Sequence, residues 1–323
     1  MKICITSGVK LPVLLYGGAE RVIWDLCEIL SSLNHEVYLL APCGTTCSFS
    51  KVIEFNSYER IEELIPSDTD VVHFFSPVPE NFDGNFVYTL QGNARFGEVL
   101  PKQTVFISRN QARRHGGDYY VYNGLTPRVS DINNKREAFH FLGKAAWKRK
   151  NVKGAILCAR KANRTPIDIL GGTRLNFNMG FRLTTDLHAR FHGMVDDDFK
   201  NKVMSNSKGL VFPVRWHEPF GLAIIESLFA GCPVFGTPYG SLPELVSNDV
   251  GFLSANSDDL AEAMKDSGKW NPNLCRDYAL ENFNSKKMAL KYLEIYERVI
   301  DGEVLNKSIP TLQKTEPKML PFK

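Results

Sequence analysis

The densest group of chemically useful side chains lies in Trp216–Val234, the segment WHEPFGLAIIESLFAGCPV. It holds two carboxylates eight residues apart, Glu218 and Glu226. Pro219 suits the first turn of a helix, because the N–H that proline lacks would have no partner there. We therefore predict a helix over residues 219–230, with one carboxylate just before it and the other about two turns inside it.

The start of this predicted helix is suited to binding an anion. The amides of Phe220, Gly221 and Leu222 would lack an intrahelical partner, and the helix dipole adds positive potential. Gly221 also lets a phosphate approach the backbone closely. Eight residues span ~12 Å along a helix, so the two carboxylates suit the hydroxyl groups at both ends of a nucleoside diphosphate sugar. Carboxylates accept charge-assisted hydrogen bonds from such hydroxyls.

The two carboxylates also have structural interpretations, as solvated helix residues or as a helix cap. Glu226 is embedded in an apolar run, where a solvated role is disfavoured because a buried charge needs a partner. We therefore favour ligand binding for both glutamates.

A second group of charges lies in the loop GKAAWKRKN, residues 143–151. Gly143 follows a predicted strand, and four basic residues come after it: Lys144, Lys148, Arg149 and Lys150. Lysines at the end of a strand can neutralise a departing diphosphate without a metal ion. A solvated basic loop is the alternative interpretation.

These groups need elements that position them, and the hydrophobic pattern indicates alternating strands and helices. The first unit reads as a strand at 2–6, a helix opening at Gly17 and Gly18, and a strand at 36–42, which implies a parallel sheet. The pattern stops in the polar segment 126–137 and restarts at 139–142. We predict an α/β chain with a domain over 1–125, a linker over 126–137, a domain over 138–285, a long helix over 286–300 and a mobile tail over 303–323.

The chain resembles the retaining glycosyltransferases of family 4, the bacterial group 1 glycosyl transferases, over most of its length. The segment around the two glutamates is similar to their E-x7-E signature. Weaker motifs follow in matching order: YGGAER at 16–21, DVVH at 70–73, TLQGN at 89–93, FISRN at 106–110, YNGL at 122–125, FLGK at 141–144 and YGSLPELV at 239–246.

The resemblance implies a GT-B fold, in which two Rossmann-like domains have parallel sheets that face each other across a cleft. It implies a donor held by the C-terminal half, retention of the anomeric configuration, no metal and no cofactor. Glu218 would contact the sugar and Glu226 the ribose, and the Gly17–Gly18 loop would lie across from the donor phosphates. The helix at 286–300 would cross back to the N-terminal domain.

Two positions depart from the family pattern. The family has an Arg directly after the glycine at 143 and a Lys six positions later, and the matching residues are Lys144 and Lys150. At Lys144 the charge is kept and the bidentate fork is lost. Gln91 stands where many relatives have a His; its amide can form hydrogen bonds but carries no proton at neutral pH. Any acid–base role at Gln91 is therefore in doubt.

Several polar residues have two interpretations from sequence. Glu20 and Arg21 are either acceptor-side residues or surface charges. His73 ends a predicted strand and is either an acceptor contact or a packed histidine. Residues 113–115 (RRH) form either an interfacial patch or a solvated helix end, and we favour the latter.

Composition limits the class of protein and the cellular compartment that we expect. The 323 residues carry a net charge of +3, too little to indicate nucleic acid, and no apolar segment is long enough to span a membrane. Seven cysteines, mostly in apolar stretches, fit reduced thiols in the cytoplasm, and Cys43 and Cys47 lack the partners of a zinc site. Any membrane contact would be peripheral, at the inner face.

We therefore expect a metal-independent hexosyltransferase that uses a nucleotide sugar and a glycan or glycolipid acceptor, in the synthesis of a cell-surface polysaccharide or glycolipid. The alternatives are a catalytically silent subunit that binds sugar nucleotides, motivated by Gln91, and a nucleotide-sugar epimerase on the same fold. A dehydrogenase is disfavoured, because no G-x-G-x-x-G follows the first strand.

Overall fold

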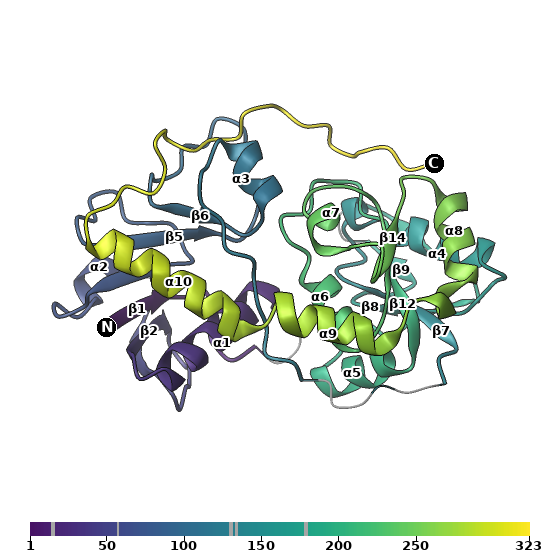
Figure 1. Cartoon of the computed structure of the whole chain (residues 1–323), viewed down its shortest axis with the longest axis horizontal. Coiled ribbons are helices and arrows are strands. Elements are labelled where there is room, and N and C mark those ends of the chain that lie inside the picture. Colours follow the sequence, from purple (N-terminus) through teal and green to yellow (C-terminus); the bar gives the residue numbers. More distant parts are fainter. Residues whose placement is uncertain (14–16, 57, 129–131, 133–134, 178–179) are drawn as a thin grey trace. The chain divides into compact units, whose positions relative to one another are not determined.

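The computed structural model describes residues 1–13, 17–56, 58–128, 132, 135–177 and 180–323. The chain divides into two compact units (Figure 1): unit 1 comprises Met1–Thr126 and Phe283–Thr315, and unit 2 comprises Pro127–Asn282 and Glu316–Lys323. Each unit contains a six-stranded sheet in which all the pairings are parallel. The predicted α/β class with two parallel sheets is confirmed.

Unit 1 has the strand order β3-β2-β1-β4-β5-β6, the order of a doubly wound sheet. Its strands are β1 (Lys2–Thr6), β2 (Glu36–Pro42), β3 (Lys51–Phe55), β4 (Val71–Phe74), β5 (Phe86–Leu90) and β6 (Thr104–Phe106). Its helices are α1 (Gly18–Ser32), α2 (Ile61–Leu64), α3 (Arg109–His115) and α10 (Ser285–Ile300). Unit 1 therefore takes its last helix from far along the sequence.

The helix α10 is the predicted helix at 286–300, and its apolar face packs within unit 1. The side chain of Asn284 caps it by accepting a hydrogen bond from the amide of Lys287 at 2.7 Å. Tyr292 and Tyr296 on its inner face are fully buried. Their hydroxyl groups reach polar side chains of β4 and β5, which ties the helix to that sheet.

Unit 2 repeats the architecture with the strand order β11-β8-β7-β12-β13-β14. These strands are β7 (Ala138–Leu142), β8 (Ile167–Leu170), β11 (Ala189–Phe191), β12 (Ser207–Phe212), β13 (Val234–Gly236) and β14 (Gly251–Leu253). The short strands β9 (Leu175–Asn176) and β10 (Arg182–Leu183) pair antiparallel as a separate hairpin. The α-helices are α4 (Val152–Lys161), α5 (Asp197–Ser205), α6 (Leu222–Phe229), α7 (Leu242–Leu245), α8 (Ser257–Lys265) and α9 (Pro272–Asn282).

The connection between the two units, predicted at 126–137, lies partly outside the described residues. Its last part is anchored to unit 2 by Arg136, whose guanidinium donates to the carbonyl oxygens of Ser207 at 2.9 Å, Gly231 at 2.8 Å and Ala230 at 2.9 Å. These bonds tie the segment before β7 to the turn after α6.

The C-terminal tail differs from the predicted mobile segment. In unit 1 the amide of Leu100 donates to the carbonyl of Pro310 at 3.0 Å, and the buried side chains of Leu305 and Leu312 add apolar contacts. In unit 2 the amide of Leu320 donates to Arg215 at 2.7 Å, as Ser257 does to Lys323. Backbone hydrogen bonds and buried leucines outweigh the polar, proline-rich composition that indicated mobility.

None of the helices in the part of the chain that the structure describes is long and apolar enough to cross a membrane.

Candidate functional site

The structure brings Glu218 and Lys150 together at one edge of the sheet of unit 2. The ammonium of Lys150 donates to both carboxylate oxygens of Glu218, at 2.8 and 2.7 Å. The indole N–H of Trp216 donates to the same carboxylate at 2.8 Å. Both ion-pair partners are largely buried, with 13% of the Lys150 side chain and 7% of the Glu218 side chain exposed. The pair is thus a fixed, partly desolvated charge cluster.

The topology explains this meeting. Lys150 follows β7 and Glu218 follows β12, and the two strands are neighbours in one parallel sheet. The carboxyl ends of parallel strands lie at the same edge, which is where ligands bind in open α/β sheets. The sequence predicted both residues, but their direct contact depends on the strand order.

Aromatic rings surround the basic loop. The ammonium of Lys150 lies 5.1 Å from the ring centre of Phe212 and 5.4 Å from that of Trp216. The guanidinium of Arg149 lies 4.7 Å from the Trp216 ring, and the exposed Lys144 lies 5.6 Å from the Trp147 ring. Such cation–π contacts stabilise cations that have lost part of their hydration.

Two glycines shape the strand ends beside this loop. Gly143 has a φ of +149°, and its amide donates to Leu170 at 3.0 Å. Gly171 has a φ of +110°, and a Cβ there would lie 2.4 Å from the carbonyl oxygen of Gly143. The backbones after β7 and β8 therefore approach so closely that no side chain fits between them.

The loop that carries Glu218 is held by the turn after β13. Gly240 has a φ of +64°, and a Cβ there would lie 2.3 Å from the backbone nitrogen and oxygen of Glu218. The amide of Ser241 donates to the carbonyl of Glu218 at 3.0 Å, and its hydroxyl donates to that of Phe220 at 2.5 Å. The motif at 239–246 thus fixes the backbone position of Glu218.

The predicted helix start at Pro219 is wrong. The helix α6 begins at Leu222, and Gly221 caps it with a left-handed φ of +95°. A helix cannot continue through that conformation, so Pro219 and the buried Phe220 lie in the preceding loop. Glu226 is therefore the fifth residue of the helix, little more than one turn inside, and the ~12 Å estimate from an unbroken helix does not apply.

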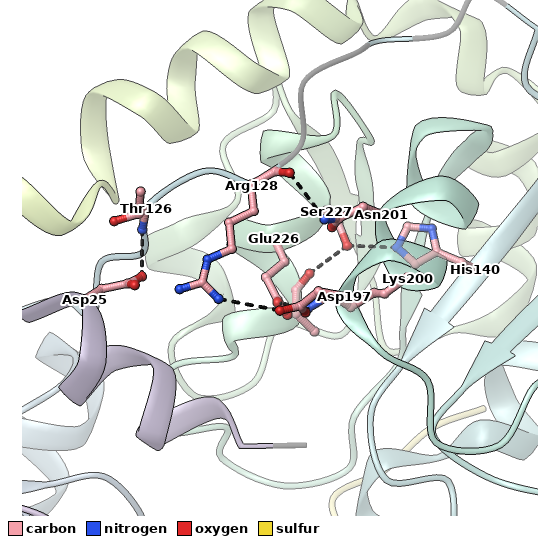
Figure 2. Close-up of polar contacts among 10 residues, drawn as sticks. Asp25, Thr126, Arg128, His140, Asp197, Lys200, Asn201, Glu226 and Ser227 are labelled. Atoms are coloured by element: carbon pink, nitrogen blue, oxygen red, sulfur yellow. Dashed lines mark hydrogen bonds and ion pairs between the residues drawn. The ribbon is translucent and has the colours of Figure 1, made fainter. Parts of the chain in front are cut away.

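Glu226 has a protein partner that the sequence did not reveal (Figure 2). The ammonium of Lys200, on α5, donates to its carboxylate, and it also lies 2.8 Å from a carboxylate oxygen of Asp197. Lys200 is buried, and 17% of the Glu226 side chain is exposed. Nothing in the local sequence links the two helices; they meet because both pack beside β12.

Further polar contacts connect this ion pair with the first residues of unit 2. The guanidinium of Arg128 lies 3.5 Å from the carboxylate of Asp197, and the side-chain amide of Asn201 donates to the carbonyl of Arg128 at 3.3 Å (Figure 2). A chain of charges therefore runs from Arg128 through Asp197 and Lys200 to Glu226. Asp196 caps α5 by accepting from the backbone amide of Phe199 at 2.9 Å.

A buried histidine, His140, contacts the helix α6. One ring nitrogen of His140 pairs with the hydroxyl of Ser227 at 2.8 Å (Figure 2). The other pairs with the hydroxyl of Ser207 at 2.7 Å. Burial lowers the pKa of His140 to about 3, so the ring is neutral at physiological pH. His140 was not singled out from the sequence, and it serves the core rather than proton transfer.

The candidate residues of unit 1 are Gly17, Gly18 and Gln91. Gly17 caps α1 with a φ of +153°, and Gly18 begins that helix. The preceding Tyr16 lies outside the described residues. Gln91 follows β5 and exchanges amide hydrogen bonds with the buried Asn123, at 3.3 and 3.0 Å. The orientation of the Gln91 amide is therefore fixed by Asn123.

The hydrogen-bond partners of His73 decide between its two interpretations from sequence. Its ring nitrogens pair with the hydroxyls of Tyr296 and Thr89, each at 2.7 Å. Burial lowers the pKa of His73 to about 3. His73 is therefore a packed core histidine and not an acceptor contact.

Two other basic side chains of unit 1, Arg21 and His115, are buried and are therefore not surface charges. Arg21 is buried on α1, so it is not a surface charge, whereas Glu20 is half-buried. In the 113–115 segment, His115 is fully buried and stacks on Phe106, with ring centres 5.3 Å apart. The favoured interpretation of this segment as a solvated helix end is therefore wrong for His115.

Among the described residues, no group of three or more acidic, histidine or cysteine side chains could hold a metal ion. Cys43 and Cys47 are free thiols.

The family model for glycosyl transferases group 1 matches residues 125–277. A protein of Klebsiella pneumoniae, described as an uncharacterized 41.2 kDa protein in the cps region, is 30% identical over 114 residues, 33% of this chain. The match spans about a third of the length of that relative, 32%.

Solved glycosyltransferases share the fold over nearly the whole chain. AviGT4, a glycosyltransferase of avilamycin A biosynthesis, is 20% identical with a TM-score of 0.76, covering 94% of this chain and 98% of its own. Sucrose-phosphate synthase from Thermosynechococcus elongatus is 14% identical with a TM-score of 0.69, covering 94% and 100%. HepE from Anabaena, in complex with UDP-glucose, is 15% identical with a TM-score of 0.63, covering 92% and 99%. The chain therefore has the GT-B fold, and its residues 125–277 match the family model of the group 1 glycosyl transferases.

Proposed function

We propose that this chain transfers a hexose-like sugar from a nucleoside diphosphate sugar to an acceptor hydroxyl, with retention and without a metal ion. The observation that carries the proposal is the buried Glu218–Lys150 pair at the carboxyl edge of the sheet of unit 2. A preorganised charge pair beside the start of α6 suits a ligand with hydroxyls and an anionic group side by side. The UDP-glucose complex of HepE supports a nucleotide sugar as the donor.

In this proposal each charged residue has a separate task. Glu218 accepts hydrogen bonds from the sugar hydroxyls and Glu226 from the ribose. Lys150, Lys144 and the first amides of α6, from Leu222 onward, stabilise the charge of the departing diphosphate. The Lys150–Glu218 pair holds both side chains in place before the donor arrives, so little reorganisation is needed during the reaction.

The proposed chemistry needs no side-chain base. The acceptor oxygen forms a bond to the anomeric carbon while the bond from that carbon to the diphosphate oxygen breaks. In a reaction on one face of the sugar, the departing oxygen is close enough to take the acceptor proton. Gln91 then has only to contribute hydrogen bonds to the sugar, a task that the Asn123-held amide and its backbone carbonyl can serve.

The acceptor class is a further part of the proposal. The Klebsiella relative belongs to a cps region, which supports a role in the synthesis of a surface polysaccharide or glycolipid. Such an enzyme would work in the cytoplasm or at the inner membrane face, where nucleotide sugars are made, and its free thiols, most of them buried, fit a reducing compartment.

A screen of nucleotide sugars by thermal shift, followed by donor-consumption assays, tests the function. We expect one nucleoside diphosphate sugar to raise the melting temperature and to be hydrolysed or transferred, and Glu218→Gln to abolish that turnover. Tight donor binding without turnover in the wild type, together with turnover in Gln91→His, would establish the silent-subunit alternative. A product that is an isomerised nucleotide sugar would establish the epimerase instead.

A further inference from the structure

The basic loop of unit 2 contains an arginine, Arg149, that two tryptophans hold in place. Its guanidinium lies over the ring of Trp216, 4.7 Å from the ring centre, and 5.9 Å from the ring centre of Trp147. The two indole rings meet edge to face, with their centres 6.4 Å apart. Arg149 is exposed, and no carboxylate in the described part of the chain forms an ion pair with it.

The backbone of Arg149 is fixed beside the loop that carries Glu218. Its carbonyl accepts a hydrogen bond at 2.7 Å from the amide of Arg215, the residue directly before Trp216. The indole N–H of Trp216 in turn donates to the carboxylate of Glu218 at 2.8 Å. Trp216 therefore contacts both the Arg149 guanidinium and the carboxylate that is proposed to bind the sugar.

The charge balance of this cluster leaves a role for Arg149. A nucleoside diphosphate sugar carries a negative charge on each phosphate, and its diphosphate gains more charge on the oxygen that leaves the sugar. Lys150 is already matched by Glu218, so that pair as a whole adds no net positive charge. Lys144 and Arg149, on the same loop, are matched by no carboxylate among the described residues.

The shape of the guanidinium suits Arg149 to a diphosphate. A guanidinium presents N–H donors along its edge and binds two phosphate oxygens side by side, whereas an ammonium acts as a point charge. Contact with an aromatic ring uses the face of the guanidinium and leaves that edge accessible. The neighbouring Arg215 has a different task, because its Nε donates to the carbonyl of Leu320 at 2.8 Å.

We propose that Arg149 binds two oxygens of the donor diphosphate and stabilises the charge that develops as the diphosphate leaves the sugar. The assignment rests on the proposed function, and it adds a bidentate contact that Lys144 and Lys150 do not make. Trp147 and Trp216 are positioning residues, which hold the guanidinium before the donor arrives.

Isothermal titration calorimetry with UDP, ADP, GDP and dTDP tests this assignment. The nucleotide that binds the wild type is then titrated into variants of the full chain. Arg149→Gln should lower the association constant about tenfold, as expected for the loss of a hydrogen bond to a charged group. Arg149→Lys should lower it less, because the charge remains. The affinity of Arg149→Gln should also fall less steeply with added NaCl than that of the wild type, because one cation fewer faces the phosphates.

Lys148 offers a matched control. It is an exposed cation of the same loop, but its ammonium lies against Gly180, where an added Cβ would be 3.2 Å away. Lys148→Gln removes the same charge as Arg149→Gln and should change the affinity by less than about twofold in 150 mM NaCl, where the screening length is about 8 Å. The melting temperature of each variant verifies its fold.

The outcomes separate this assignment from the proposed function. Undiminished nucleotide binding by Arg149→Gln, an equal loss in Lys148→Gln, or an Arg149→Lys variant as weak as Arg149→Gln would overturn the role of Arg149 and leave the proposed function in place. Absence of binding by the wild type to all four nucleotides would instead overturn the proposed function, and this assignment with it.

Discussion

At the scale of single residues, the Glu218–Lys150 pair decides how the proposed site works. Glu218→Gln keeps the size of the side chain but leaves the Lys150 ammonium, which is 13% exposed, without its counter-charge. Breaking a buried pair by removing one partner costs about 3–5 kcal/mol in general. We expect turnover to fall by more than about 100-fold, measured as donor consumption by a variant whose melting curve shows a folded protein.

The Gln91 position is the natural comparison for that variant. Because the departing diphosphate can take the acceptor proton, a base at residue 91 is not required, and general acid–base help where it operates gives about 10²–10⁴-fold. We therefore expect Gln91→His to change turnover by less than about tenfold, and Gln91→Ala to cost less than Glu218→Gln. A Gln91→Ala variant as impaired as Glu218→Gln would contradict the proposed division of tasks.

A third prediction at the scale of single residues concerns Lys200. Its ion pair fixes the Glu226 carboxylate, so Lys200→Met should weaken nucleoside diphosphate binding, whereas Lys200→Arg should retain most of it. Glu226→Ala alone should cost about 1.5–3 kcal/mol of binding free energy. If Lys200 acts through Glu226, calorimetry on the double variant should show little further loss. Fully additive losses would mean that the two side chains act separately.

At the scale of elements, turns rather than helices hold the candidate site. A Cβ on Gly240 would lie 2.3 Å from the backbone of Glu218, whereas Gly193, also in unit 2, has nothing within 4 Å. Both have a positive φ, +64° and +72°, so alanine brings similar backbone strain, about 1–3 kcal/mol, to either.

We therefore expect Gly240→Ala to lower the free energy of unfolding more than Gly193→Ala, and to weaken donor binding as well. Urea unfolding monitored by circular dichroism measures the first effect and calorimetry the second. Equal effects of the two substitutions would show that the close approach to Glu218 has no energetic importance.

At the scale of the whole molecule, each unit has a buried neutral histidine, His73 in unit 1 and His140 in unit 2. Burial lowers the pKa of each to about 3, from an ordinary value of 6.5. Between these values the unfolded chain binds a proton that the folded chain does not, so folding stability falls as pH falls. The loss is about 1.4 kcal/mol per pH unit for each histidine.

Chemical unfolding between pH 7 and pH 4 measures this dependence. We expect His73→Asn and His140→Asn to have a lower free energy of unfolding at neutral pH but a shallower decrease toward acid. The comparison of slopes distinguishes a titration effect from lost packing, because lost packing alone would shift the curve without changing its slope. Unchanged slopes in both variants would refute the assignment of neutral, buried rings.

The sequence by itself determined the alternation of strands and helices, the division into two α/β halves, and Glu218, Lys150 and Gln91 as candidates. These features depend on local information, since hydrophobic periodicity, glycine positions and short motifs are properties of neighbouring residues. The start of α6 was misplaced because proline suits a helix start at 219, whereas the left-handed φ of Gly221 depends on how the loop packs against Gly240 and Ser241.

Only the tertiary structure decided which side chains meet. Lys150 pairs with Glu218 because β7 and β12 are neighbours, and Lys200 pairs with Glu226 because α5 and α6 lie beside the same strand. His73 is a core residue because helix α10, which lies more than 200 positions later in the sequence, supplies the hydroxyl of Tyr296 that pairs with its ring. Pairings over such distances depend on topology, and a single sequence does not encode topology in any local pattern.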